Sequence, residues 1–599
     1  MKACWSRRFS LLSALILAAL GASSARAADD ALFKGLDDEL QRSMQKLQLG
    51  DLEKPYFIAY TVQDAKYQSV SATFGSLVCK AESRYRLLTV EVRVGDYAFD
   101  NTNFLSMPFG STGVTRLFGG TITIPLDDDY REIRRQVWLA TDGAYKKALE
   151  DLAHKRGASR NRSQSERLPD FSKEEPVRLT EDTAPDLPNL EDSAQLVREL
   201  SAILRRAKDV DISDVHLRAS TLRTLYLNSE GTTFTRVTPS LALIAVAGTQ
   251  AVDGMPLQDF AAWFGRSMKD LPPKVRLSSR LEELNERLGA LRTAPLLDRY
   301  NGPVLFEGQA AAELFSQVFA PKLLATRRPS ADDARIEAYL GAMDNPFLDK
   351  LGARVLPEFL NLVDNPTLEE FAKIPLAVRY AVDDEGVRAR ETKLVEHGVL
   401  RTLLSTRSPV SGIEHSTGNR RGQGILPSNL ILTADNGLSE QALREQFIKL
   451  IQQRRKEFGI VVRRLGNPAL KASPDGSSMM FVQRGRGEED LEDPIAAYKV
   501  FPDGHEELIR NVNLTGIGLS TFKDIVAASS TPTVYTSPFT ARNTGIFPTI
   551  SFFELAQGEG GKPIISVAVP SLLFDDLTLR KPTGNIPKPP TFPRPIADN

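Results

Sequence analysis

The stretch from Gly302 to Phe319 constrains the fold of this chain more than any other, because it changes from a strand pattern to a helix pattern within a few residues. Val304 to Phe306 form a short apolar strand pattern, and Gly308 breaks it. Apolar side chains then recur at the spacing of one helix face: Ala311, Leu314, Phe315 and Val318. We therefore expect a helix from Ala310 to Phe319.

This helix carries alanines where a metal site would need ligands. Two histidines one turn apart, with a glutamate, would make such a helix a hydrolytic zinc site. The chain has five histidines, and none lies four residues from another: His154, His216, His397, His415 and His505. Solvated or locally hydrogen-bonded histidines are the expected state, and a metal site assembled from scattered residues is the alternative.

Other catalytic patterns are weak. The Gly-x-Ser-x-Gly pattern of a serine nucleophile is absent from the sequence. Cys79 lies in a strand pattern, which favours a buried structural thiol over a nucleophile. Glu307 and Glu313 flank the junction helix and could act as an acid/base pair. An acid at the helix N-terminus and an exposed glutamate explain them at least as well.

The N-terminus has the pattern of a cleavable secretory signal. Basic residues precede an apolar run from Leu11 to Leu20, and Ala25-Arg26-Ala27 offers small residues at the cleavage positions. We expect cleavage after Ala27 and a periplasmic or secreted protein. The apolar run is too short to span a membrane, and Cys4 precedes it rather than following it, so no membrane anchor is expected.

Charge and cysteine content narrow the function classes. Removing residues 1–27 takes away four basic residues and no acid, which moves the formal net charge from -1 to -5. This balance gives no basic footprint for nucleic acid. Cys79 is then the remaining cysteine, so an intramolecular disulfide is excluded. Apolar cores must stabilise the protein, and a chain of 599 residues predicts two or more of them.

We expect an α+β fold in two domains. The N-terminal α/β domain spans 28–298 and includes a charged loop or linker, rich in Pro, Ser and Asp, at about 155–192. The C-terminal domain spans 299–580 and is rich in strands. A Pro-rich tail follows at 581–599.

Periodicity places the elements within these domains. Helices are expected over 30–49, 130–154 and 194–206, and around Leu281, Leu284, Leu288 and Leu291. Strands are expected over 56–62, 70–79, 85–94, 216–227, 240–248 and 564–569. In the C-terminal domain, turn signals at 383–386, 397–398 and 502–504 predict antiparallel pairing, the first between 376–382 and 390–396.

A polar segment, Glu414-His-Ser-Thr-Gly-Asn-Arg-Arg-Gly-Gln-Gly424, separates two strand patterns. Its small and polar residues indicate a surface loop with accessible backbone groups, suited to bind a peptide or another subunit. The candidate binding residues are Ser416, Thr417, Gly418, Asn419, Arg420 and Arg421. An ordinary long hairpin loop fits the pattern equally well.

Several segments together resemble the TldD/PmbA family, whose members are also labelled modulator of DNA gyrase or metalloprotease TldD/TldE. They are Gly302-Pro-Val-Leu-Phe306 with its Ala-rich helix, Asp384-Glu-Gly386, Leu394-Val-Glu-His-Gly-Val-Leu400, Ser416-Thr-Gly-Asn419 and Pro570-Ser-Leu-Leu573. The resemblance covers most of the chain up to Leu579 and is most specific between Gly302 and Asn429.

The resemblance implies a zinc-binding His-Glu-x-x-x-His helix in the TldD type, with a distant cysteine, and a homologous metal-free TldE (PmbA) partner. The two histidine positions fall on Glu307 and Ala312, and the catalytic glutamate position falls on Gly308. The cysteine has no counterpart, because none follows Thr515. The resemblance therefore implies the fold, the two-domain layout and a pairing habit, without a metal, a cofactor or catalytic residues.

We expect an exported, TldE-like, non-catalytic subunit of a peptide-degrading complex, paired with a homologous zinc-bearing subunit or with itself and holding an extended peptide. One alternative is a hydrolase active by itself, with metal or acid chemistry built from Glu307, His397 or His415. A second alternative is a peptide-binding or scaffold protein of the cell envelope.

Overall fold

The computed structural model describes residues 31–105, 121–160, 168–183, 185–207, 209–331, 333–341, 345–422, 424–470, 491–510, 513–539 and 563–581. The predicted signal segment and all but the first residue of the Pro-rich tail lie outside this part of the chain. No helix of the described residues is long and apolar enough to cross a bilayer.

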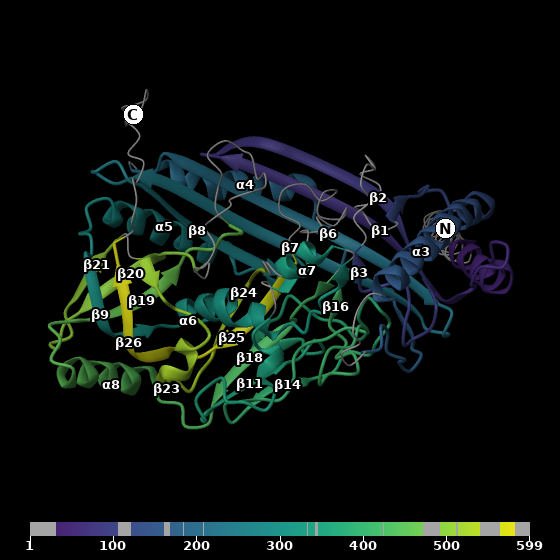
Figure 1. Ribbon diagram of the computed structural model, residues 1–599. Helices are drawn as coiled ribbons and strands as arrows, with labels where there is room; N and C mark the ends of the chain where they lie inside the picture. The colour runs from purple at the N-terminus through teal and green to yellow at the C-terminus, as the bar shows by residue number, and fades with distance from the viewer. Residues whose placement is uncertain are drawn as a thin grey trace, which may run out of the picture.

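One large sheet dominates the first half of the molecule (Figure 1). Its strand order is β4-β2-β1-β6-β7-β5, and β8 also pairs with β7. The strands are β1 (Pro55–Thr73), β2 (Ser76–Val94), β4 (Thr121–Thr123), β5 (Arg178–Glu181), β6 (Ile212–Asn228), β7 (Thr233–Gln250) and β8 (Pro256–Gly265). The helices are one over 31–46, α3 (Tyr130–Arg160), α4 (Leu190–Arg205) and α5 (Lys274–Leu291), with a 3-10 turn at Met268–Asp270.

Two long strands replace the three predicted at 56–62, 70–79 and 85–94. β1 and β2 each span 19 residues and meet in a hairpin whose turn residues, Phe74 and Gly75, have φ of 46° and 86°. Two consecutive positive φ values match the twist of paired strands. The polar residues that break the sequence pattern are mostly half-buried in β1, where Gln68 is buried, and exposed in β2 from Lys80 to Arg84. Cys79 is exposed, so the predicted buried thiol is wrong.

The charged segment at 155–192 is more ordered than expected. Helix α3 continues to Arg160, and β5 pairs in parallel with β7. Phe171 and Val177 are buried in an apolar cluster with Phe57 of β1. Because these two apolar side chains anchor the segment to the sheet, the prediction of an exposed loop is wrong for 168–181.

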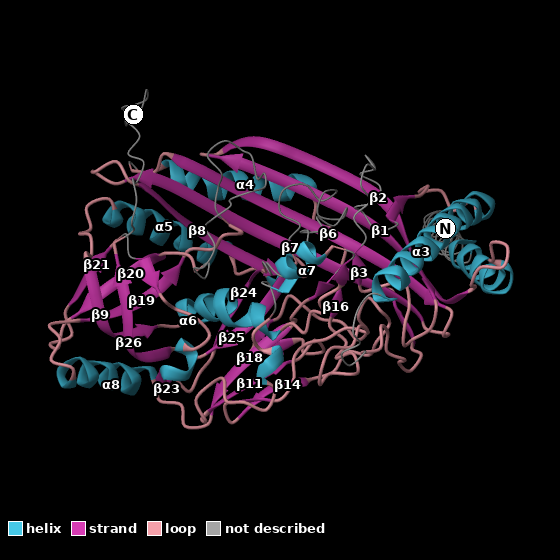
Figure 2. Ribbon diagram, in the orientation of Figure 1, coloured by secondary structure: helices cyan, strands magenta, loops and turns pink. Residues whose placement is uncertain are grey.

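The second half contains two further large sheets (Figure 2). One has the order β15-β14-β11-β18-β25-β24: β11 (Leu360–Asp364), β14 (Thr392–Glu396), β15 (Val399–Leu400), β18 (Asn429–Ala434), β24 (Thr533–Pro538) and β25 (Ile564–Val569). The other has the order β21-β20-β19-β9-β26-β22, with β23 also on β26: β9 (Arg299–Phe306), β19 (Gly459–Leu465), β20 (Pro494–Val500), β21 (Glu506–Ile509), β22 (Asn513–Thr515), β23 (Ile525–Ala528) and β26 (Leu572–Arg580).

Short elements complete this half. They are α6 (Gln309–Leu314), a π-helical turn (Phe315–Phe319), 3-10 turns at Ala320–Leu323, Leu348–Lys350 and Thr521–Asp524, α7 (Ala334–Gly341) and α8 (Glu440–Gln453). The short strand pairs are β12 (Glu370–Phe371) with β13 (Ile374–Pro375), β16 (Arg420–Arg421) with β17 (Gly424–Ile425), and β3 (Phe104–Leu105) with β10 (Ser330–Ala331). The last pair joins the two halves of the chain.

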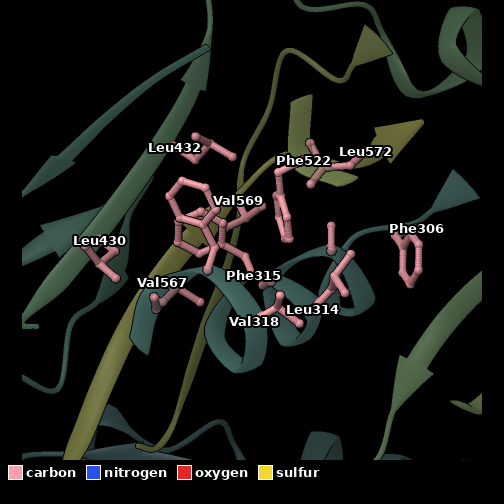
Figure 3. Close-up of a cluster of buried hydrophobic side chains, with 14 of the residues drawn as sticks. Phe306, Leu314, Phe315, Val318, Leu430, Leu432, Phe522, Val567, Val569 and Leu572 are labelled. Carbon is pink, nitrogen blue, oxygen red and sulfur yellow. The ribbon is translucent and has the colours of Figure 1, made fainter. Parts of the chain in front are cut away.

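The junction helix lies in the main apolar core. Side chains of α6 and the π-helical turn, including Leu314 and Phe315, pack among residues of β18 and β25 such as Leu430 and Val567 (Figure 3). This confirms the strand-to-helix change predicted at Gly308. It also explains the alanines, because Ala310, Ala311 and Ala312 are fully buried between strands.

The α+β, two-domain architecture is confirmed, while the boundary at 298/299 stays a prediction. Two of the three predicted turns join paired strands: residues 397–398 join β14 to β15, and 502–504 join β20 to β21. The turn at 383–386 forms, but its flanks meet in a single bridge between Val382 and Arg388. The strand expected over 376–382 is wrong, because Tyr380 bonds to Pro366 instead of to a neighbouring strand.

Candidate functional site

The β9–α6 junction is shaped around Glu307 and Gly308. The Glu307 amide donates to the Val462 carbonyl of β19, which fixes the end of the strand. Gly308 then adopts φ 52° and ψ -113°, and its amide donates to Ser571 Oγ at 2.9 Å. A Cβ here would meet Thr533 Oγ1 at 3.5 Å, an ordinary contact. The positive φ, rather than lack of space, favours glycine.

Two arginines neutralise Glu307. Arg444 of α8 donates to Glu307 Oε1 at 3.0 Å, and Arg463 of β19 donates to Glu307 Oε2 at 2.8 Å. Both arginines also bind Glu506 of β21, which closes a four-residue ring of alternating charge. Each of these side chains is partly exposed. Glu307 therefore holds three strands and a helix together, and its oxygens are occupied by guanidinium groups.

Glu313 is fully buried, so the expectation of an exposed glutamate is wrong. α6 has only six residues and is covered on both sides, by β19 and by the other sheet. The Leu465 amide donates to Glu313 Oε2 at 2.6 Å, and Gln309 donates to Oε1 at 2.8 Å. Burial raises the pKa of Glu313 to about 7, although the nearby Arg464 guanidinium opposes this rise. Glu313 can therefore exchange a proton near neutral pH.

Arg464 connects this acid to the first sheet. Its Nε lies 3.7 Å from Glu313 Oε1, and its Nη1 lies 3.9 Å from Asp259 Oδ1 of β8. Its Nη2 donates to the Phe260 carbonyl at 3.1 Å. Asp259 is also paired with Arg287 of α5. The acid/base pair considered from the sequence is thus divided: Glu307 belongs to an exposed-edge ion network and Glu313 to a buried one.

The polar segment at 416–419 is buried, so the prediction of a surface loop is wrong for these residues. Ser416 and Asn419 are 1% and 0% exposed. Asn419 Nδ2 donates to Asp364 Oδ2 at 2.8 Å, and Thr417 Oγ1 donates to Asn419 Oδ1 at 2.7 Å. These small polar side chains satisfy one another and the backbone inside the protein, which an exposed loop would leave to water.

Arg420 and Arg421 form β16 and are partly exposed. Arg421 donates to the Pro427 carbonyl at 2.9 Å and to the Ile564 carbonyl at 3.1 Å. The Arg420 amide donates to Asp383 Oδ2 at 3.0 Å. Burial, together with the adjacent Glu385 carboxylate, raises the pKa of Asp383 well above its usual range. The peptide-binding role of the six residues from Ser416 to Arg421 stays a prediction, and these two arginines are its most accessible members.

The histidines do not gather at the junction. His397 lies 3.3 Å from Asp435, and His415 lies 3.5 Å from Glu174. Across the described residues, no group of three or more His, Cys, Asp or Glu side chains is arranged to hold a metal ion. Glu307, His397 and His415 therefore form no joint centre there. The residues at the family's two ligand positions also do not fit zinc, since Ala312 has no donor atom and both carboxylate oxygens of Glu307 accept hydrogen bonds from arginines.

Sequence reasoning missed the buried arginines. Arg464 lies in a strand whose other side chains are nearly all buried, and Arg407 is itself only 1% exposed. The signal for Arg464 was present: Gly459-Ile-Val-Val-Arg-Arg-Leu465 places two arginines in a row, and strand alternation requires one of them to face the core.

Comparisons with known proteins agree with this architecture. Residues 299–463 match the family described as the PmbA/TldA metallopeptidase C-terminal domain. A metalloprotease of Methanothermobacter thermautotrophicus is 30% identical over 38% of this chain and 48% of its own length. A metalloprotease of Methanocaldococcus jannaschii is 37% identical over 14% of this chain and 17% of its own length. The chain spans less than half the length of each of these relatives.

Solved structures show the same fold over nearly the whole chain. A protein described as a modulator of a DNA gyrase from Thermotoga maritima superposes with a TM-score of 0.58 and 16% identity, covering 91% of this chain and 100% of its own. TldE from Thermococcus kodakarensis superposes with a TM-score of 0.55 and 14% identity, covering 88% and 96%. Residues 299–463 therefore belong to the PmbA/TldD family of C-terminal domains, and the solved structures show that the fold of such proteins extends over nearly the whole chain.

Proposed function

We propose that this protein is an exported, non-catalytic subunit of a peptide-degrading complex, of the TldE type. Its partner would be a homologous subunit that carries the zinc and the hydrolytic residues. The support is the family membership of residues 299–463, the metalloprotease names of the relatives and the structural likeness to a TldE protein.

The β9–α6 junction carries this proposal. Glu307 stands at the first histidine position, but its two oxygens accept hydrogen bonds from Arg444 and Arg463. Gly308 stands at the catalytic glutamate position with a backbone that is not helical. Ala312 stands at the second histidine position and is fully buried. Glu307 thus forms ion pairs, Gly308 allows the turn of the backbone, and Ala312 packs in the core, so each of the three positions has a structural role.

Zinc titration tests the proposal. The purified protein is incubated with one to several equivalents of zinc, desalted and examined by native mass spectrometry. We expect no stoichiometric tightly bound zinc. A protein that retains one zinc per chain, and loses peptide cleavage on Glu307→Ala or His415→Ala, would establish the self-sufficient hydrolase instead. Lys46→Ala, which changes an exposed residue of the helix over 31–46, more than two hundred residues from Glu307 and His415, serves as the matched activity control.

Partner capture tests the pairing. Affinity purification from the native cell is expected to recover a homologous chain with an intact His-Glu-x-x-x-His helix, and mixing the two should restore cleavage of an extended peptide. Recovery of neither a zinc-bearing relative nor any peptidase activity would favour the envelope scaffold reading.

The compartment has its own test. Fractionation followed by N-terminal sequencing is expected to find a mature chain that begins at Ala28 in the periplasmic or secreted fraction. A cytoplasmic chain that keeps residues 1–27 would refute export, but it would not contradict the proposed TldE role.

A further inference from the structure

The outer edge of β2 is the most exposed stretch of regular structure in the large sheet. The seven consecutive residues from Val78 to Arg84 are exposed, although they lie within a 19-residue strand. β4 covers β2 only from Leu87 to Thr89, and the following Ile124 amide donates to the Arg86 carbonyl. β2 is the last long strand on its side of the sheet (Figure 1). Within the described residues, no strand pairs with this edge between Ser76 and Tyr85.

The direction of the backbone groups on this edge follows from Arg86. In an antiparallel ladder, alternate residues direct both their N–H and C=O groups to the same neighbouring strand. The Arg86 carbonyl faces β4, on the outer side. Pairing with β1 runs without a register shift from Asp64↔Arg86 to Val70↔Lys80. Arg84, Glu82 and Lys80 therefore present their backbone groups outward, ready to pair with an added strand.

The side chains on these three residues select both the partner and the register. We propose that the β2 edge joins a second copy of this chain, with the two β2 strands antiparallel about a two-fold axis through Ala81. In this register Lys80 of each copy lies opposite Glu82 of the other, which gives two opposite-charge pairs across the new ladder. A two-fold axis requires such a self-complementary surface.

The alternative registers that keep the backbone groups matched are disfavoured by charge. Centring the axis on Lys80 places lysine opposite lysine. Centring it on Glu82 places glutamate opposite glutamate, and Lys80 opposite Arg84. Centring it on Ser83 brings Lys80 opposite Arg86, whose carbonyl already serves β4. Like charges directly opposite each other destabilise a strand pair. Of the four registers centred from Lys80 to Ser83, only the Ala81 register avoids them. A register centred on Cys79 places Lys80 opposite Val78 and so forms no opposite-charge pair.

The charged residues are held in place for this contact. Lys80 Nζ pairs with Glu191 at the start of α4, and Glu82 accepts from Gln68 Nε2 of β1 at 2.6 Å. Arg84 binds Asp64 of β1 through two nitrogens. Side chains fixed by neighbours within the same chain lose less conformational freedom when a partner arrives. The inference does not depend on the proposed TldE role, because it concerns two copies of this chain.

Disulfide trapping tests the register. In a full-length Cys4→Ser/Cys79→Ser background, Ala81→Cys should form a covalent dimer under mild oxidation, because directly opposite residues lie about 4.5–5.5 Å apart between Cα atoms, within disulfide reach. The matched control restores the native Cys79 alone. In this register the two Cys79 residues lie four positions apart along the strands, about 13 Å, and cannot be bridged. Equal cross-linking of both variants, or of neither, overturns the proposal.

Charge reversal tests the partner. Lys80→Glu and Glu82→Lys should each weaken dimerisation roughly tenfold, since each creates two like-charge pairs. The double variant Lys80→Glu/Glu82→Lys should recover the dimer, measured by sedimentation equilibrium. Glu191→Gln is the control for the lost intrachain pair, and it should weaken dimerisation much less than the charge reversals do, because it creates no like-charge pair across the ladder. A monomeric wild type refutes self-pairing at this edge, and so does a double variant that dimerises as weakly as the single variants. The proposed function is tested separately: capture of a zinc-bearing partner would support it even if self-pairing fails.

Discussion

Two buried arginines fasten the first half of the chain to the second, and their surroundings differ sharply. Arg407 binds Glu230 through two nitrogens at 2.7 and 2.8 Å and donates twice to the Ser172 carbonyl, at 3.0 and 2.6 Å. Arg464 makes one hydrogen bond, to Phe260, and its Nε and Nη1 have no hydrogen-bond partner among the described residues. All three nitrogens of Arg407 therefore donate hydrogen bonds, and we call this arrangement a saturated pair. Only one nitrogen of Arg464 donates to a described residue.

The difference separates two uses of buried charge. A bidentate pair whose remaining hydrogens also find acceptors offsets much of its desolvation cost and fixes a single geometry. An arginine held mainly by carboxylates 3.7 and 3.9 Å away keeps a larger part of that cost. The first arrangement is suited to a permanent fastening. The second leaves the protonation of Glu313 free to change the strength of the contact.

Arg407→Ala should produce the largest loss of stability, about 3–5 kcal/mol, because it leaves Glu230 charged and largely buried without its partner. The midpoint of urea unfolding, followed by tryptophan fluorescence, measures the loss. Glu230→Ala is the reciprocal variant and should cost a similar amount. Joint replacement, Arg407→Met/Glu230→Gln, should cost less than either single change, and a larger cost for the pair would contradict the saturated-pair interpretation.

Glu313→Gln should alter the pH dependence of stability. The folded-state pKa of Glu313 is about 7, above its usual 4.5, so its contribution is fully present below about pH 4.5 and is lost as the pH rises through 7. The wild type should therefore lose roughly 3 kcal/mol of unfolding free energy relative to Glu313→Gln between these pH values. Parallel stability curves for the two proteins over this range would show that Glu313 is already ionised when folded. Asp51→Asn, which removes an exposed carboxylate in the turn before β1, controls for the general loss of one acid.

Arg464→Met should cost less than Arg407→Ala, about 1–3 kcal/mol, since only one hydrogen bond is broken and Glu313 can take up a proton. The same variant should raise the pKa of Glu313 further, because it removes the group that opposes the effect of burial. Carbon-13 NMR of the glutamate carboxyl groups would detect the shift. An unchanged titration would show that Arg464 does not act on Glu313.

The sequence predicted the elements better than the contacts between them. Helical spacing located α6, and Leu281, Leu284 and Leu288 identified the buried face of α5. It could not show that Phe171, in a segment rich in charge, would anchor to the sheet, because this depends on partners distant in sequence. The burial of Ser416–Asn419 could not be predicted for the same reason. A run of polar residues predicts an exposed loop, and the hydrogen-bond partners that allow these residues to be buried, Asp364 and Ser405, lie outside the segment.

The junction divides in the same way. The sequence alone shows that Glu307, Gly308 and Ala312 do not carry the residues of the zinc motif. The two arginines that bind Glu307 come from α8 and β19, more than a hundred residues away, so the sequence could not reveal them. Local spacing identifies what a position lacks. Only the fold shows what has taken its place.

Phe171→Leu should give the smallest effect and refine the comparison most. The Arg407 guanidinium lies 3.8 Å from the centre of the Phe171 ring, and the Arg93 guanidinium lies 3.6 Å from it. Leucine keeps an apolar side chain there but removes the aromatic face, so about 1–2 kcal/mol should be lost. Combined with Arg407→Ala in a double-mutant cycle, the two losses should sum to more than the double variant shows, by about 0.5–1 kcal/mol. Strict additivity would mean that hydrogen bonds alone hold Arg407, and that the ring serves only to exclude water from them.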